Sequence, residues 1–403
     1  MTEYLSAAEA AVRLGVSRQT LYAYVSRGLL TGHAAGDPRQ RRYDAAEVAG
    51  LAMAHRRGRR PKEVAKATLD WGLPVLESAI TLIHDGRLYY RGIDAVAHAV
   101  SASIEETAGL LWRVPPDAAF PATPPGNPPV MAALFSHYGG RRRDEALLPL
   151  FAAATSDDAT AVWRENSASG YGDLVRSLVS CVTGAPPSAG PVHQQLAQIW
   201  GLDAAGADLV RMALVLCADH ELNASSFTAR CIASTGASLR ACVLGGLAAL
   251  SGGLHGGMTA RIEAFWDGLS ADDLTGQIRR RLAAGEALPG FGHKLYPGGD
   301  VRAAALLTRI GPDFPFPGQI SMAVEGLTGR APNIDFALVA LRRHARLPEG
   351  AAFCLFALGR SLGWIAHALE QRETRQLIRP RAIYTGPAGT GAVAVAGINP
   401  PRR

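Results

Sequence analysis

Most of the chain beyond residue 92 carries the hydrophobic periodicity of α-helices. Apolar residues recur at intervals of three and four positions, and Gly and Pro interrupt the pattern, as at 184–191. One helix with an apolar face is predicted over 104–112. The segment 115–129 holds seven prolines and is predicted to be an irregular surface loop.

Residues 80–90 follow a different period. Side chains alternate between apolar and polar character in 80–83 and again in 87–90, on either side of His84-Asp85-Gly86. This alternation around a short turn predicts a β-hairpin. The whole pattern therefore predicts an all-α fold that includes one small hairpin.

The first fifty or so residues predict a separate helical unit. Ser6 to Glu9 is a capping box that opens a short helix. Ser17 can cap a second helix over 18–27, which Gly28 would close, and Asp44 can cap a third. The first two helices form a helix-turn-helix pattern, and a Gly- and Pro-rich stretch separates them from the third.

Composition and charge place these elements in a globular protein. The 403 residues suggest two or three domains, with 48% hydrophobic and 19% charged residues. The five cysteines have no CxxC spacing and predict reduced core residues in a cytoplasmic protein. The start of the chain does not resemble a signal peptide, and the apolar stretch 241–254 is too short to span a bilayer, so no membrane partner is expected.

The basic excess belongs to the N-terminal segment. Residues 1–66 hold twelve Lys and Arg against six Asp and Glu, which accounts for the whole net charge of +6. The unit resembles the winged helix-turn-helix of MerR-type regulators, which implies duplex DNA as a partner. In that interpretation the major groove would be contacted by Arg18, Gln19 and Tyr22, and phosphates by Arg41 and Arg42. A docking or dimerisation role without DNA is the open alternative.

Two histidines mark a candidate site in the second half of the chain. His220 and His255 are joined by residues that are almost all small, which predicts one buried helix with a histidine at each end. Glycine pairs flank His255, at 252–253 and 256–257, and are expected to bring the backbone close to a ligand and to have no packing role. His220 taken alone is equally typical of a buried core histidine.

Two further groups complete the candidate chemistry. His293 follows Leu288-Pro-Gly-Phe-Gly292, a loop whose glycines were expected to leave backbone N–H groups free for a ligand. Asp335 lies near a predicted helix start, where an acidic side chain can simply interact with the helix dipole. No GxxxxGK[ST] loop and no HExxH zinc motif occurs in the sequence.

These motifs, taken together and in order, resemble the citrate synthase family. The resemblance covers residues 217–386 and rests on the segments DHELNAS at 219–225, LHGG at 254–257, LPGFGHKLY at 288–296, NIDF at 333–336 and GRSLGW at 359–364, with IRPR at 378–381. The chain departs from the family pattern where Val301 replaces a proline and Lys294 an arginine. Because of these departures, the resemblance does not decide which acyl-CoA and which keto acid are the substrates.

The resemblance implies an acyltransferase that uses a coenzyme A thioester and no metal. Such an enzyme condenses an acyl-CoA with a 2-keto acid, and the leading candidates for these substrates are acetyl-CoA and oxaloacetate. The implied catalytic residues are Asp335 as base, His255 as donor to the enol oxygen and His293 as donor to the keto oxygen. The implied ligands of the substrate are His220, Arg302, Arg360 and Arg379, and those of coenzyme A are Leu288, Gly290, Gly292 and Lys294.

The resemblance also implies a homodimer and a domain plan. Arg379 would come from the neighbouring subunit. The predicted plan is a winged helix-turn-helix at 1–54, a basic linker at 55–72, a large domain at 73–260 with 346–403, and a small domain at 261–345. Three alternatives stay open: a 2-methylcitrate synthase, a citryl-CoA lyase, and a DNA-binding metabolite sensor that has kept the pocket.

Overall fold

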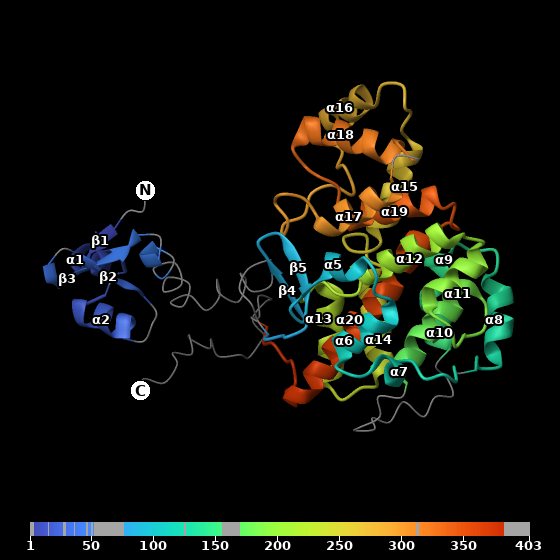
Figure 1. Ribbon diagram of the computed structural model, residues 1–403, viewed down its shortest axis with the longest axis horizontal. Coiled ribbons are helices and arrows are strands. Elements are labelled where there is room, and N and C mark those ends of the chain that lie inside the picture. Colours follow the sequence, from blue (N-terminus) through green and yellow to red (C-terminus); the bar gives the residue numbers. More distant parts are fainter. Residues whose placement is uncertain are drawn as a thin grey trace, which may run out of the picture. The chain divides into compact units, whose positions relative to one another are not determined.

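A computed structural model describes residues 4–14, 16–26, 30–35, 37–45, 47–49, 51, 76–124, 126–154, 170–311 and 314–382. The chain divides into two compact units, residues 1–77 and residues 78–403 (Figure 1). The basic linker predicted at 55–72 and Gly28 lie outside the described residues. Each unit is described separately below.

The N-terminal unit combines a helix-turn-helix with a small sheet, and the capping bonds predicted at Ser6 and Ser17 are formed. Ser6 Oγ accepts from the N–H of Glu9 while the Glu9 carboxylate accepts from the N–H of Ser6, and Ser17 Oγ accepts from the N–H of Thr20. A three-stranded antiparallel sheet in the order β1-β3-β2 forms the wing, with His33 opposite Arg42. The elements are β1 (Tyr4–Ser6), α1 (Ala7–Leu14), α2 (Arg18–Ser26), β2 (Gly32–Ala35) and β3 (Asp37–Asp44).

A small core orients the exposed face of this unit. Leu21 and Tyr43 are fully buried, because α2 and β3 pack around the same apolar cluster. The side chains of Arg18, Gln19 and Tyr22 on α2 stay exposed, as do Arg41 and Arg42 on the wing. The five predicted DNA contacts therefore all face solvent.

The second unit is helical apart from one small sheet, so the predicted fold class is confirmed. The hairpin pairs His84 with Arg87, and its two turn residues, Asp85 and Gly86, have φ of 48° and 72°, as a type I′ turn requires. The first elements of this unit are β4 (Thr81–His84), β5 (Arg87–Tyr90), β6 (Ile93–Asp94), α5 (Ala95–Ala99), α6 (Ile104–Trp112), α7 (Pro116–Ala119), α8 (Val130–Tyr138), α9 (Arg143–Ala153), α10 (Tyr171–Thr183), α11 (Val192–Trp200), α12 (Ala204–Leu216), α13 (Ala224–Ser234) and α14 (Leu239–Leu250).

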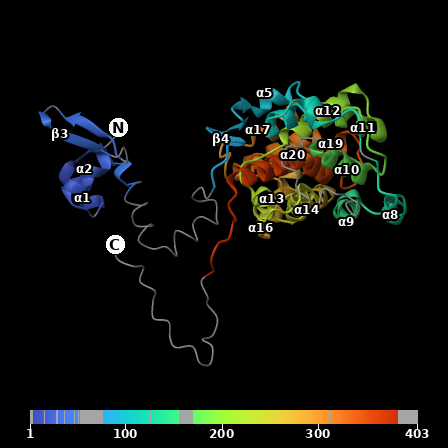
Figure 2. The same ribbon diagram turned by 90° about the horizontal axis from the view of Figure 1, so that it is seen from below.

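The long helix α20 (Ala351–Thr374) is the centre of this unit. Helices α6, α9, α10, α12, α13 and α14 pack around it (Figures 1 and 2). It is the one helix in the described part of the chain that is long and apolar enough to cross a membrane, but it is buried inside the protein, as a core helix is. Helices α15 (Met258–Asp267), α16 (Leu274–Ala283), α17 (Val301–Ile310), α18 (Phe316–Thr328) and α19 (Ile334–His344) form the upper part of the unit in Figure 1.

A glycine on α20 sets its approach to the candidate site. A Cβ at Gly363 would lie 2.3 Å from Asp219 Oδ1 and 2.6 Å from the carbonyl oxygen of Ala218. Only a residue without a side chain lets α20 press on the turn that precedes His220. The N–H of Gly363 also donates to the carbonyl of Ala218 over 2.9 Å.

Two predicted elements differ from the structure. The proline-rich loop at 115–129 contains the short helix α7, because Pro116 suits the first turn of a helix and the apolar residues Ala119 and Phe120 pack inward. The single buried helix expected between His220 and His255 is instead two helices, α13 and α14. The chain breaks between them at Gly236, which has a φ of 81°.

Candidate active site

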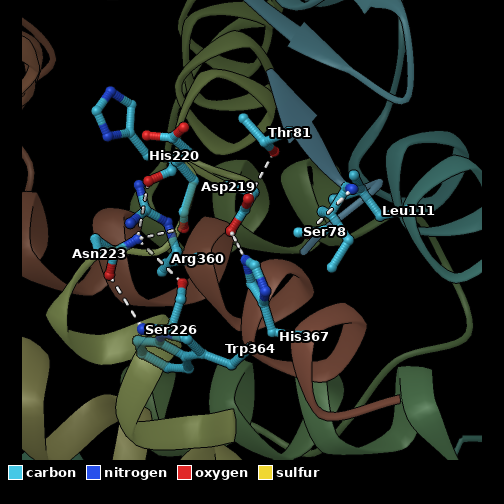
Figure 3. A network of polar contacts seen from close by, with 12 residues as sticks. Ser78, Thr81, Leu111, Asp219, His220, Asn223, Ser226, Arg360, Trp364 and His367 are labelled. Carbon is cyan, nitrogen blue, oxygen red and sulfur yellow. Dashed lines mark hydrogen bonds and ion pairs between the residues drawn. The ribbon is translucent and has the colours of Figure 1, made fainter. Parts of the chain in front are cut away.

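The turn that carries His220 is anchored by its neighbour Asp219. The Asp219 carboxylate is fully buried; Oδ2 accepts from Thr81 Oγ1 over 2.6 Å, and Oδ1 lies 3.3 Å from His367 Nε2. Figure 3 shows Asp219 between Thr81 and His367. His220 Nε2 lies 3.1 Å from the hydroxyl of Tyr296. Burial first, and then Arg302 and Arg360, hold the pKa of His220 well below its usual range, so this histidine is neutral.

His255 lies in the glycine-flanked turn after α14, as predicted. Its Nε2 is 3.0 Å from Ser225 Oγ, and its ring stands edge-on to Phe356. Burial, reinforced by Arg360, lowers the pKa of His255 to about 4. The expectation that the flanking glycines have no packing role was wrong for the second pair. A Cβ at Gly256 would lie 2.7 Å from Leu250, and one at Gly257 would lie 2.5 Å from a backbone oxygen.

The loop that carries His293 is held against the start of α19. The N–H of Gly292 donates to the carbonyl of Ala331 over 2.8 Å, and Asn333 N–H donates to the carbonyl of Gly290 over 2.9 Å. The prediction that Gly292 offers a free N–H was therefore wrong. Gly290, with a φ of 89°, is needed instead because a Cβ there would crowd Ile262 and Phe336 at 3.0 and 3.1 Å.

A backbone contact sets the tautomer of His293. The N–H of Leu295 donates to His293 Nδ1 over 3.2 Å, so in the neutral ring the proton is on Nε2. Burial, with a further contribution from Arg302, lowers the pKa of His293 to about 4. The rings of His220 and His293 are edge-to-face with their centroids 5.0 Å apart. Neutral His293 can therefore donate a hydrogen bond beside His220.

Asp335 lies in the first turn of α19, where the helix start was predicted. Asn333 caps this helix by accepting from the N–H of Phe336. Asp335 is half-buried as a residue, but its Oδ1 is buried and has no hydrogen-bond partner among the described residues. Burial raises the pKa of Asp335 to about 7, against the opposing effect of Arg302. This environment suits a base that works near neutral pH.

Asp300 links the arginine Arg302 to the start of α19, the helix that carries Asp335. It caps α17, pairs with Arg302 through two bonds of 3.0 and 2.8 Å, and accepts from the N–H of Ile334 over 3.0 Å. Asp300 and Arg302 are both buried. The sequence analysis missed Asp300 as a positioning residue, although it opens the same DVRA segment that carries Arg302.

Arg360 is buried with one part of its guanidinium uncommitted. Its Nε donates to the carbonyl of Cys217 over 2.9 Å, and the group stacks over Phe356 at 4.9 Å. Its Nη2 is buried without a hydrogen-bond partner in the described chain. A buried donor of this kind is costly unless a ligand meets it, and a carboxylate is the matching acceptor.

The structure brings most of the predicted residues to one place. Arg360 contributes to the pKa shifts of His220, His255 and Asp335, and Arg302 to those of His220, His293 and Asp335, so these groups surround a common buried region. Of the remaining predicted residues, Arg379 is exposed beyond the end of α20, Lys294 is exposed, and Leu288 is half-buried. In the described part of the chain, no three His, Cys, Asp or Glu side chains gather as a metal-ligand set.

Comparison with known proteins agrees with this geometry. Residues 142–381 match the family described as citrate synthase, C-terminal domain, and residues 4–56 match a helix-turn-helix domain. The chain is 32% identical over 355 residues to the Mycobacterium tuberculosis protein named "Putative citrate synthase 2", covering 77% of this chain and 90% of that protein. The chain belongs to the citrate synthase family.

Other members of the citrate synthase family show the breadth of the match. A 2-methylcitrate synthase of Shewanella oneidensis is 33% identical over 197 residues, which is 46% of this chain and 52% of that protein. A structure of citrate synthase from Thermoplasma acidophilum, in a ternary complex with carboxymethyl coenzyme A and oxaloacetate, shares the fold with a TM-score of 0.66. It is 24% identical and covers 80% of this chain and 97% of that one.

Proposed function

We propose that this chain condenses an acyl-CoA, acetyl-CoA first, with a 2-keto acid, oxaloacetate first, and hydrolyses the resulting thioester. The observation that carries the proposal is Asp335, a carboxylate whose Oδ1 is buried and unpartnered and whose pKa is raised to about 7. Such a carboxylate is a stronger base than an exposed one, as removal of a proton from a thioester methyl group requires. The free cysteines fit a cytoplasmic setting.

In the first step Asp335 takes a proton from the carbon beside the thioester carbonyl, and negative charge moves to the thioester oxygen. His255 donates a hydrogen bond to that oxygen. This role requires the proton on Nδ1, and therefore a hydroxyl of Ser225 that donates to His255 Nε2. Trp364 Nε1 donates to the same Ser225 oxygen over 3.0 Å, which leaves the hydroxyl proton available for the histidine or for Asn223 Oδ1.

In the second step the enolate carbon attacks the keto carbon. His293 donates from Nε2 to the keto oxygen and supplies the proton that this oxygen gains when the new carbon–carbon bond forms. Arg302 and Arg360, with His220, would hold the carboxylates of the keto acid. Water then cleaves the thioester and releases the coenzyme A thiol.

The substrate assignment is tested by thiol release. Acetyl-CoA with oxaloacetate is expected to give the fastest release, and propionyl-CoA a slower one, because an added methylene changes apolar contacts by about 1–3 kcal/mol. Rates are measured with both thioesters against oxaloacetate and other 2-keto acids, and citryl-CoA cleavage is followed in parallel. Faster propionyl-CoA turnover would assign a 2-methylcitrate synthase, and cleavage without condensation would assign a lyase.

A homodimer with shared sites is part of the proposal. Arg379 is exposed in the single chain, while a dicarboxylic substrate benefits from a further guanidinium. If Arg379 serves the partner's site, a mixture of the inactive chains Asp335→Ala and Arg379→Ala is expected to regain thiol release, since one site of a mixed dimer would hold both intact residues. Absence of recovery despite demonstrated subunit exchange would place Arg379 outside the partner's site.

We propose a second function, DNA binding, for the N-terminal unit. Its match to a helix-turn-helix domain and the exposure of Arg18, Gln19 and Tyr22 on α2 favour it. Exposed Arg41 and Arg42 on β3 suit phosphate contacts from a wing. A chain that bound DNA and the substrates without turnover would instead be a metabolite sensor, which the thiol-release assay distinguishes.

Gel-shift titration tests the DNA contacts. Full-length protein is expected to bind duplex DNA with a log–log salt slope of several units, because each phosphate contact contributes about 0.9. Arg18→Ala is expected to reduce sequence preference, whereas Arg42→Ala weakens binding to all sequences alike. Arg309→Ala, an exposed arginine of the second unit, is the control. Equal effects of the Arg18 and Arg309 changes would contradict a recognition role for α2.

A further inference from the structure

A cavity of about 530 Å³ lies at the C-terminal end of α20, outside the candidate active site. None of the residues assigned to catalysis lines it. Its charged lining consists of four arginines and two glutamates, namely Arg91, Arg113, Arg372, Arg375, Glu370 and Glu373. The volume falls within the range of small-molecule sites in proteins.

The balance of charge in this cavity is positive. Arg113 pairs with Glu373, but Glu370 is shared with Arg230, a buried arginine that does not line the cavity. Arg91 directs its donors to backbone carbonyls, at 2.9 and 2.6 Å from Leu111 O and 3.2 Å from Ala79 O. Burial, with repulsion from Arg113, lowers the pKa of Arg91. The lining therefore holds four guanidinium groups against two carboxylates.

We propose that this cavity binds a small phosphorylated metabolite. Planar guanidinium groups match the geometry and charge of phosphate oxygens and are held here by fixed contacts. Arg91 is fixed by its carbonyl partners, and Arg372 donates to the carbonyl of Ala237. Trp112 and Tyr171, edge-on with ring centroids 5.8 Å apart, add an aromatic part to the lining for the rest of the molecule.

A chain of polar contacts joins this cavity to the candidate active site. Glu370 accepts from the N–H of Ala79 over 2.9 Å and pairs with Arg230. Arg230 Nε donates to His367 Nδ1 over 3.0 Å, and His367 Nε2 lies 3.3 Å from Asp219 Oδ1. Asp219 directly precedes His220. An anion bound by the cavity arginines would compete with the Glu370 carboxylate for their positive charge. A shift of Glu370 would pass through Arg230 and His367 to Asp219, which anchors the turn that carries His220. This consequence rests on the proposed function.

Calorimetric titration of the full chain with inorganic pyrophosphate, at constant ionic strength, tests the site itself. Wild-type protein is expected to bind, and the double variant Arg113→Gln/Arg375→Gln to bind at least about tenfold more weakly, since it loses two charged hydrogen-bond donors. The matched control Arg280→Gln/Arg309→Gln removes two exposed arginines elsewhere. Two further titrations separate this site from the thioester site, one with saturating coenzyme A present and one with the variant Lys294→Gln. Both should leave pyrophosphate binding unchanged, because each alters only the thioester site.

The binding result does not depend on turnover, so it stands or fails apart from the proposed function. No binding by wild type, equal loss in the control, or displacement by coenzyme A would overturn the site. In the thiol-release assay, pyrophosphate is expected to change the rate of wild type and of the control, and not that of the Arg113/Arg375 variant. His367→Gln should keep pyrophosphate binding and lose the response. Binding without any change in rate would overturn the link to Asp219.

Discussion

Replacing Asp335 by asparagine is expected to lower kcat for thiol release by about 10²- to 10⁴-fold, the range that a positioned general base contributes. Asparagine has nearly the same shape, so the fold and substrate binding should persist. The wild-type rate should rise with pH through about 7, because burial raises the pKa of Asp335 to about 7 and only the ionised carboxylate can take the proton. The buried histidines His255 and His293, with pKa values near 4, stay neutral across this range.

The same pKa predicts the effect on stability. Between about pH 4 and 7 the folded protein holds a proton on Asp335 that the unfolded chain has released, so this group lowers the free energy of unfolding as pH rises through that window. Asp335→Asn removes this contribution, and its melting temperature should exceed that of wild type more at pH 8 than at pH 4. Asp267→Asn, at an exposed carboxylate, is the matched control for stability.

A variant of Asp335 that kept more than about a tenth of the wild-type rate of thiol release would contradict the assignment of Asp335 as the base.

Arg360→Gln is expected to lower kcat/KM for the keto acid by about 30- to several thousand-fold, mainly through KM. Loss of one partner of a buried, hydrogen-bonded charge pair costs about 2–5 kcal/mol, because the other charge remains buried without compensation. The buried and unpartnered Nη2 of Arg360 is the donor that would meet the substrate carboxylate. Glutamine can still donate to the carbonyl of Cys217, the partner of Arg360 Nε in the structure. KM for the acyl-CoA should change little.

A buried arginine away from the site controls for general damage to the fold. Arg176 is buried like Arg360 and donates to the carbonyl of Pro121, so Arg176→Gln removes a comparable group from the core. It is expected to lower the melting temperature and leave KM for the keto acid unchanged. If both variants raised that KM equally, the role of Arg360 would be structural and the carboxylate would bind elsewhere.

The two functions proposed for this chain place different demands on its units. Every residue assigned to catalysis lies beyond residue 219, and the exposed arginines assigned to DNA lie before residue 43. Loss of one function through its own residues should therefore leave the other measurable. The cavity at the C-terminal end of α20 would give the catalytic unit a separate binding site for an anion.

Local signals predict most of the elements and mark several residues of the candidate site. Capping residues such as Ser6, Ser17 and Asn333 act on the N–H groups of the next few residues, so their helices can be predicted from the sequence alone. The alternation around Asp85-Gly86 predicts the hairpin for the same reason. His255 and His293 stand out for the glycine-rich turns beside them, whereas the role of Asp335 rests on the resemblance of NIDF at 333–336 to the citrate synthase family.

Long-range packing accounts for what the sequence could not show. Whether Gly292 offers its N–H to a ligand depends on Ala331, which is far away in the chain and takes that bond in the folded protein. The partners of Asp300 and the link from Arg230 through His367 to Asp219 likewise join separate helices. Periodicity carries no information about such pairs. The pKa of Asp335 follows from burial, and burial exists only once α17, α19 and α20 have packed together.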